Sequence, residues 1–144
     1  MNYMKKVFAF MLALTMALGV MGCSNRTEIT KDDIVDKIYV YEKDGCGSDF
    51  TIEIKADGTF TYYEGMLSSH IGRGEWVYLD GMLTLTEKTV RFKDASELEE
   101  VTVSYSFSVK KDTLVFEDNG VDNFRYVKVK DGEKFLAQKV RVDS

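Results

Sequence analysis

Hydrophobic and polar residues alternate along most of the chain after Lys37, and a period of two is typical of half-buried β-strands. The longest run covers residues 101–109, where Val, Val, Tyr, Phe and Val alternate with polar residues. Shorter runs occupy residues 38–41, 50–55, 60–62, 76–78, 83–86, 114–116 and 124–129. One dry and one wet face predict about eight or nine strands of an antiparallel sheet around one core.

Asp-Gly and Asn-Gly pairs separate these runs, and such pairs supply the positive φ angles of tight hairpin turns. They are Asp44-Gly45, Asp57-Gly58, Asp80-Gly81, Asn119-Gly120 and Asp131-Gly132. Short sequential connections predict a meander, and the absence of proline suits central strands. We therefore expect an all-β, antiparallel meander that closes into a β-barrel, because closure removes exposed edges. A two-sheet β-sandwich is the alternative.

The first 23 residues follow a different pattern. Lys5 and Lys6 precede an apolar stretch from Val7 to Val20, and Val20-Met21-Gly22-Cys23 follows directly. As a helix, those 14 residues would extend only ~21 Å, which is short of the ~30 Å hydrocarbon core of a bilayer. A charged start, a short apolar stretch and a small residue before the cleavage point are the parts of a secretory signal.

The segment Val20-Met21-Gly22-Cys23 resembles the lipobox of bacterial lipoproteins. The resemblance implies cleavage before Cys23, diacylation of its sulfur and a cell-membrane anchor on the extracytoplasmic face. Residues 1–22 are then a signal peptide, residues 23–33 a polar tether with a helical turn near residues 30–36, and residues 34–144 one domain. Ser24 would suit transport to the outer membrane in a two-membrane cell. An ordinary secretory signal or an uncleaved anchor is the alternative.

Removal of the signal leaves 17 basic and 24 acidic residues, a net charge of −7. That balance argues against nucleic acid or anionic lipid head groups as partners. With Cys23 consumed by lipid, Cys46 stands alone and forms no intramolecular disulfide. We expect Cys46 to be a small buried residue, with a nucleophilic pair of Cys46 and His70 as the alternative.

Several segments also resemble small lipocalin-like lipoprotein domains. The segments that carry this resemblance are Asp57-Gly58-Thr59-Phe60-Thr61-Tyr62, Gly72-Arg73-Gly74-Glu75-Trp76 and Leu83-Thr84-Leu85. Together with Asp131-Gly132-Glu133-Lys134-Phe135, these segments are also similar to extracytoplasmic domains of BlaR-type regulatory membrane peptidases. Trp76 falls near the fourth strand, whereas the G-x-W of true lipocalins lies in the first. The resemblance implies a fold rather than a reaction.

Aromatic residues and one loop supply the candidate contacts for a small ligand or an envelope protein. Tyrosine and tryptophan combine an apolar body with a polar tip, so they can line a ligand cup, although core packing is the alternative. The loop at residues 66–71 adds a histidine and an arginine near it. The candidates are Tyr62, His70, Arg73, Trp76, Tyr78 and Tyr105.

Acidic residues give weaker signals. Asp118 and Asp122 form a weak calcium candidate, with a plain Asn-Gly hairpin as the alternative. Residues 94–100 read as a solvated loop or helical turn. The acidic residues are expected mostly in turns or on the wet face, which does not favour paired acid and base catalysis.

No catalytic or cofactor motif is present in the sequence, so we expect no cofactor, no metal centre and no enzyme. The sequence therefore favours a lipid-anchored extracytoplasmic binding or sensing module. A structural or interaction lipoprotein without a ligand site is the alternative, and an envelope enzyme is third.

Overall fold

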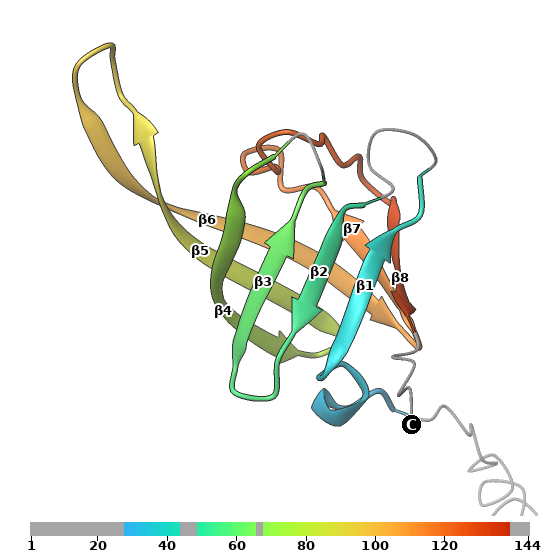
Figure 1. Ribbon diagram of the computed structural model, residues 1–144. Coiled ribbons are helices and arrows are strands. Elements are labelled where there is room, and N and C mark those ends of the chain that lie inside the picture. Colours follow the sequence, from blue (N-terminus) through green and yellow to red (C-terminus); the bar gives the residue numbers. More distant parts are fainter. Residues whose placement is uncertain (1–27, 44–48, 66–67, 139–144) are drawn as a thin grey trace, which may run out of the picture.

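The computed structural model describes residues 28–43, 49–65 and 68–138, and within these ranges it is an all-β barrel. Its strands are β1 (Lys37–Tyr41), β2 (Thr51–Ile54), β3 (Thr59–Tyr63), β4 (Ile71–Leu79), β5 (Met82–Phe92), β6 (Leu98–Lys110), β7 (Thr113–Glu117) and β8 (Lys134–Gln138). Each strand pairs antiparallel with the next, and β1 pairs with β8 to close the sheet (Figure 1). The predicted antiparallel meander and barrel are confirmed, and the sandwich alternative is wrong.

The inward side of every strand is apolar, as the alternating pattern requires. Large aromatic side chains fill the middle of the barrel and are almost completely buried: Tyr39, Phe50, Phe60, Phe107, Phe116 and Phe135. Phe50 and Phe107 each meet Phe135 edge to face, with ring centroids 5.0 and 5.6 Å apart. The centre of the barrel is therefore a packed core rather than a ligand cavity.

Two of the predicted tight turns form as expected. Gly58, with φ of 88°, lies between β2 and β3, and Gly81, with φ of 80°, lies between β4 and β5. The turn between β6 and β7 contains no Asp-Gly or Asn-Gly pair. Lys111 takes the positive φ there, at 35°. The pair Asp44-Gly45 lies outside the described residues.

The predicted strand at residues 124–129 is wrong, and so is the Asn119-Gly120 hairpin. Residues 118–130, which we call the capping loop, connect β7 toward β8 without strand structure. Side chains replace the missing sheet partners, because Asn123 Oδ1 accepts the N–H groups of Phe124 and Val129. The last strand is instead β8, which pairs with both β7 and β1.

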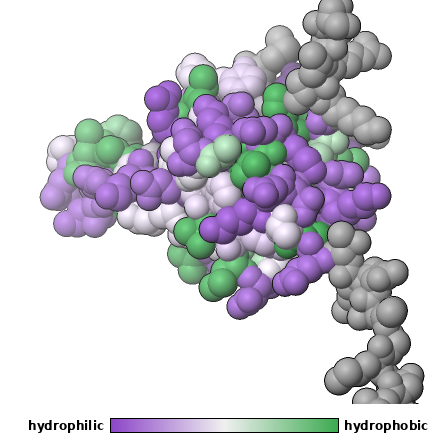
Figure 2. Space-filling model, turned by 90° about the horizontal axis from the view of Figure 1, so that it is seen from below, coloured by the Kyte–Doolittle hydropathy of each residue, from purple (hydrophilic) through white to green (hydrophobic). Residues whose placement is uncertain are grey.

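Strands β5 and β6 are longer than the barrel needs, so their far ends project as a two-stranded arm (Figure 1). The pairing of β4 with β5 ends at Glu75 and Thr86, but β5 continues to Phe92. We call residues 87–103 the arm. The prediction of a loop or helical turn across residues 94–100 is wrong for 98–100, which begin β6. Apolar residues lie exposed on the arm, where Figure 2 shows a hydrophobic cluster: Val90, Phe92 and Leu98.

The lower end of the barrel in Figure 1 is closed by the N-terminal segment. A 3-10 turn at Lys31–Asp33 confirms the expected helical turn, and the Asp33 carboxylate accepts both the N–H and the hydroxyl of Thr30. Ile34 is fully buried behind this turn. No helix within the described ranges is long and apolar enough to cross a bilayer.

The turn between β2 and β3 should respond to acid. Asp57 Oδ1 accepts the Thr59 hydroxyl at 2.6 Å and its N–H at 2.9 Å. These bonds hold the pKa of Asp57 below its ordinary value of 3.8. A lowered pKa stabilises the fold above that value, and the contribution is lost as pH falls through the folded-state pKa.

We therefore expect the stability difference between the wild type and Asp57→Asn to shrink as pH falls below about 4. Urea unfolding of both chains between pH 2 and 7 measures this difference. A difference that stays constant over the whole range would contradict the assignment.

Candidate functional site: a pocket at one end of the barrel

The inward face of β5 changes from apolar to charged as the strand leaves the core. Leu83 and Leu85 are fully buried, and the next inward residue is Glu87, whose exposed fraction is only 4%. Its partner in the β5–β6 register is Val103, which is also buried. The alternation of the strand thus places a carboxylate at the upper limit of the hydrophobic core.

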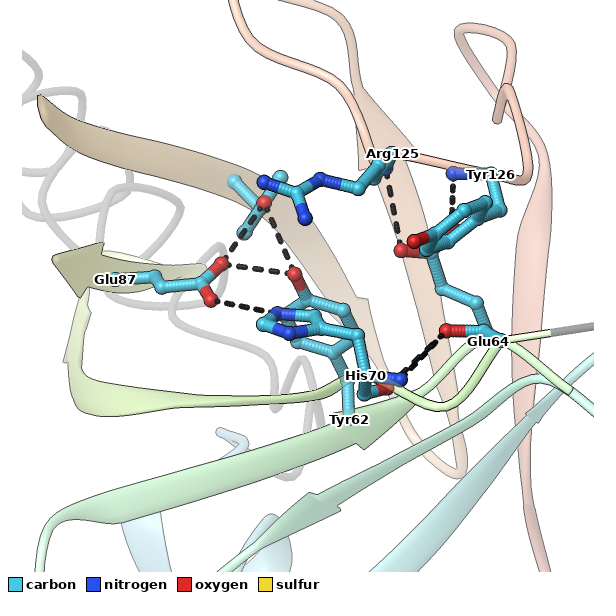
Figure 3. Close-up of polar contacts among 8 residues, drawn as sticks. Tyr62, Glu64, His70, Glu87, Arg125 and Tyr126 are labelled. Atoms are coloured by element: carbon cyan, nitrogen blue, oxygen red, sulfur yellow. Dashed lines mark hydrogen bonds and ion pairs between the residues drawn. The ribbon is translucent and has the colours of Figure 1, made fainter. Parts of the chain in front are cut away.

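Three side chains surround the Glu87 carboxylate (Figure 3). Its Oε2 atom accepts the Tyr62 hydroxyl at 2.8 Å and the Tyr105 hydroxyl at 3.2 Å. Its Oε1 atom lies 3.4 Å from His70 Nε2. A buried carboxylate is costly unless it is hydrogen-bonded, and these contacts from β3, β6 and the segment before β4 meet that need.

The two tyrosines are held as hydrogen-bond donors. Burial raises the pKa of Tyr62, and the bond to Tyr105 and the nearby Glu87 raise it further. Burial also raises the pKa of Tyr105, and Glu87 adds to the effect. Both hydroxyls therefore stay protonated across the physiological range and keep their protons toward the carboxylate.

An open pocket of about 540 Å³ lies above this cluster, between the arm and the capping loop. Its size is within the range of small-molecule sites. The floor consists of the Glu87 cluster, and three exposed cationic residues stand around the opening: Arg91, Arg125 and Lys128. Apolar side chains complete the walls: Val90, Phe92, Val103 and Val121. A polar floor, apolar walls and a cationic rim are suited to binding a small polar molecule.

A second buried carboxylate fixes the capping loop. Glu64 is 2% exposed, and its oxygens accept the backbone N–H groups of Arg125, Tyr126 and Val127 at 3.2, 2.6 and 2.8 Å (Figure 3). Glu64 therefore holds the stretch of loop that carries Arg125 and precedes Lys128. This carboxylate acts as a positioning group for the rim.

Phe124 of the capping loop fills the upper end of the core. Its ring stacks on Tyr105 with centroids 4.1 Å apart and an interplanar angle of 5°. It also meets Tyr62 and Phe50 edge to face at 5.1 and 4.8 Å. The ring is fully buried. Phe124 thus separates the filled core from the pocket and supports the two tyrosines of the floor.

The structure brings together three of the six residues proposed from sequence as contacts: Tyr62, His70 and Tyr105. Trp76 donates its indole N–H to the Lys55 carbonyl, and Tyr78 donates its hydroxyl to the Ile29 carbonyl. These two contacts belong to the opposite end of the barrel. Arg73 is exposed on β4 and does not line the pocket.

The two carboxylates proposed as a weak calcium candidate accept backbone N–H groups instead. Asp118 Oδ1 accepts the Gly120 N–H at 2.8 Å, and Asp122 Oδ2 accepts the Ser104 N–H at 3.1 Å. Within the described ranges, no group of three or more histidine, cysteine or acidic residues could hold a metal ion. Cys46, Met66 and Leu67 lie outside those ranges, so the predictions for Cys46 and the start of the loop remain predictions.

Sequence reasoning missed both buried carboxylates, which are exceptions to the expectation that acidic residues lie mostly in turns or on the wet face. Glu64 follows Phe60 and Tyr62 at the spacing of one strand face, and Glu87 follows Leu83 and Leu85 in the same way. An acidic residue that continues an apolar face was the available signal. The cationic rim had no such signal, because the capping loop has no periodic pattern.

No family model, no curated protein and no solved structure matches this chain. The fold and the site define a class of protein by themselves. It is a small eight-stranded antiparallel β-barrel, compatible with a lipocalin-like fold, whose core is filled and whose upper end carries a polar pocket.

Proposed function

We propose that this protein is a lipid-anchored extracytoplasmic binding or sensing module whose small ligand occupies the pocket above Glu87. The observation that carries the proposal is a nearly buried carboxylate at the floor of an open pocket. Its protein partners are two tyrosine hydroxyls and one imidazole nitrogen. A carboxylate has about four acceptor positions, so an incoming donor still finds one.

The same geometry gives less support to an envelope enzyme. A pair of carboxylates acting as acid and base must both reach the substrate. Here Glu87 faces the pocket, but Glu64 is occupied by three backbone N–H groups and does not line the pocket. Binding is therefore the function that the chemistry of the floor favours.

A structural or interaction role is the second candidate, and the arm favours it. Phe92 and Leu98 expose 77% and 62% of their surface, respectively, far from the packed core. Exposed apolar groups on a projecting ribbon suit a protein contact. A ligand in the pocket and a partner on the arm are compatible, because the pocket adjoins the base of the arm.

The lipobox and the position of the first described residues together suggest an orientation. Glu28 follows Cys23 by five residue steps, which span at most ~18 Å when the chain is extended. Ile29 contacts Tyr78 at the lower end of the barrel. Lipid on Cys23 would therefore hold that end near the membrane and leave the pocket and the arm facing away from it. A lipocalin-like lipoprotein domain fits this arrangement.

Replacement of Cys23 tests the anchor. Cys23→Ala should release the protein from the membrane fraction after signal cleavage, because two or three acyl chains supply the stable attachment. Cell fractionation measures release from the membrane. Metabolic labelling with a radioactive fatty acid measures loss of the lipid. Cys46→Ala is the matched control and should stay anchored and labelled. Membrane attachment of the cleaved Cys23→Ala chain would contradict the proposal.

A fragment screen tests the pocket. The full chain in detergent micelles is screened by ligand-observed NMR against polar fragments, together with the variants Glu87→Gln and Arg125→Ala. We expect a subset of fragments to bind the wild type and to weaken about tenfold or more in Glu87→Gln, since bonds to charged groups contribute about 1.5–3 kcal/mol. Glu100→Gln, on the arm outside the pocket lining, is the control.

Folding of each variant is checked by circular dichroism. Arg125→Ala changes only an exposed rim side chain, so it reports on binding even if Glu87→Gln is unstable. Fragments that bind all four chains equally, or no binding at all, would contradict a ligand site above Glu87.

A further inference from the structure

The arm projects beyond the barrel with one side of β5 uncovered (Figure 1). The register of β4 with β5 ends at Glu75 and Thr86, and from residue 87 to residue 92 the pairing within the described ranges gives β5 only β6 as a neighbour. Residues 89–92 all line the pocket although successive side chains point to opposite faces, so the pocket reaches around this side of the strand. We call residues 87–92 the open edge, because their backbone is accessible to a further strand.

Alternate residues supply the backbone groups of this open edge. In an antiparallel ladder, the N–H and C=O groups of successive residues turn to opposite sides of the strand. The Lys93 N–H donates to the Glu97 carbonyl across the arm, so the odd-numbered residues of β5 turn toward β6. Lys88, Val90 and Phe92 therefore turn their backbone groups toward the open edge.

The side chains of the same three residues share the outer face of the arm, since Glu87 faces the pocket and faces alternate along the strand. Val90 and Phe92 expose 49% and 77% of their surface, and Leu98, the register partner of Phe92, exposes 62%. Exposed apolar side chains beside unpaired backbone are features that an added strand would cover.

A second copy of this chain can supply that strand about a two-fold axis, where the same edge serves both copies. Residues directly opposite each other in an antiparallel pair share one face, so the axis must pass through a residue rather than between two. Like charges stand directly opposite when Glu87, Lys88 or Arg91 lies on the axis. Phe92 on the axis sets Arg91 against Lys93, which is also unfavourable.

Two positions of the axis remain, at Thr89 and Val90. Thr89 on the axis sets Phe92 of each copy against Thr86 of the other, where β5 is already paired with β4. With Val90 on the axis, Val90 meets itself, Thr89 meets Arg91, and Lys88 meets Phe92. All of these positions lie on the open edge, and no like charges face each other. The arrangement gives about six backbone hydrogen bonds and lays the stem and ammonium of lysine along the phenyl ring.

The β6 edge of the arm does not offer the same pairing. With Leu98, Glu99 or Glu100 on the axis, glutamates of the two copies stand directly opposite each other. An axis farther in, at Val101 or beyond, reaches Ser104, whose backbone N–H and C=O already bond side chains of the capping loop. Charge and access therefore both favour the edge of β5.

We propose that two copies of this protein pair antiparallel through the open edge, with Val90 on the two-fold axis, so that their arms form one four-stranded sheet. This inference goes beyond the proposed ligand binding and does not depend on it. It gives the interaction role of the arm a partner, a second copy of the chain. Because the pocket reaches around the open edge, strand β5 of the second copy also forms one side of the pocket.

Disulfide cross-linking in intact cells tests the pairing. Single cysteines are introduced into the Cys46→Ala chain, which is itself the baseline, and the cells are oxidised with copper phenanthroline before non-reducing electrophoresis. Val90→Cys should give a dimer band, because the Cα atoms of a hydrogen-bonded pair lie about 5.5 Å apart, within reach of a disulfide. Glu100→Cys is the matched control. Glu100 is the register partner of Val90 on β6, so it lies roughly 14 Å from its copy and should not cross-link.

Sedimentation equilibrium measures the same pairing without a new thiol. The full chain is studied in density-matched detergent micelles, where we expect the wild type to form dimers. Val90→Lys places two ammonium groups on the axis and should weaken dimerisation about tenfold or more. Thr102→Lys adds the same charge at an exposed position of β6 and should leave dimerisation unchanged.

The other outcomes overturn the proposal. They are equal cross-linking of Val90→Cys and Glu100→Cys, cross-linking of neither, a wild type that is monomeric at every concentration, and a dimer that Val90→Lys leaves intact. Cross-linking of Val90→Cys to a different protein would overturn the second copy as partner and leave the interaction role of the arm standing. The pocket is tested separately, by the fragment screen.

Discussion

Replacement of Phe124 by alanine is expected to lower the free energy of unfolding by about 3–5 kcal/mol, the usual loss for a large buried aromatic residue. The ring is fully buried and packs against Tyr105, Tyr62 and Phe50. Its removal would leave a cavity between the core and the pocket floor. Because both floor tyrosines lose a packing surface, we also expect weaker ligand binding in this variant.

Urea unfolding followed by circular dichroism measures the loss. Val121→Ala is the matched control, since Val121 lies in the same loop with 83% of its surface exposed and should change stability by less than about 0.5 kcal/mol. A Phe124→Ala variant as stable as Val121→Ala would show that the loop does not close the barrel in this way.

Glu64→Ala is expected to destabilise the chain by about 2–4 kcal/mol and to loosen the capping loop. The substitution removes the acceptor of three backbone N–H groups, at Arg125, Tyr126 and Val127. A donor left without a partner costs about 1–3 kcal/mol when it is buried. The total is lower than three such losses because Arg125 and Tyr126 are exposed and their N–H groups can bond to water.

Hydrogen exchange of the backbone at residues 125–127 is the specific readout. We expect exchange there to accelerate in Glu64→Ala and to stay slow in the control Glu100→Ala, whose side chain is exposed on the arm. Unchanged exchange at these three amides would contradict the positioning role of Glu64.

The alternating pattern was sufficient to predict the barrel, because strand faces and the turns at Gly58 and Gly81 are local properties of the sequence. It failed at the capping loop for a physical reason. Residues 124–129 alternate like a strand, but their backbone groups are satisfied by Glu64 and Asn123 rather than by a sheet partner. A side chain sixty residues away cannot be read from local periodicity.

The site was predictable only in part. Aromatic chemistry pointed to Tyr62, His70 and Tyr105, which do converge, but equally to Trp76 and Tyr78, which lie at the other end. What joins the first three is Glu87, and its importance depends on burial that sequence alone did not reveal. The pocket forms where β5 extends beyond its pairing with β4. The sequence does not show where that pairing ends.

Occupancy of the pocket above Glu87 can be followed directly at two valines. Val103 lines the pocket, whereas Val109 bonds through its N–H to Gly81 at the opposite end of β6. In the full chain with ¹³C-methyl valine, titration with the polar fragments that bind should produce saturable shifts at Val103 and leave Val109 unchanged. Saturable shifts confined to Val109, or none at either residue, would contradict a ligand site above Glu87.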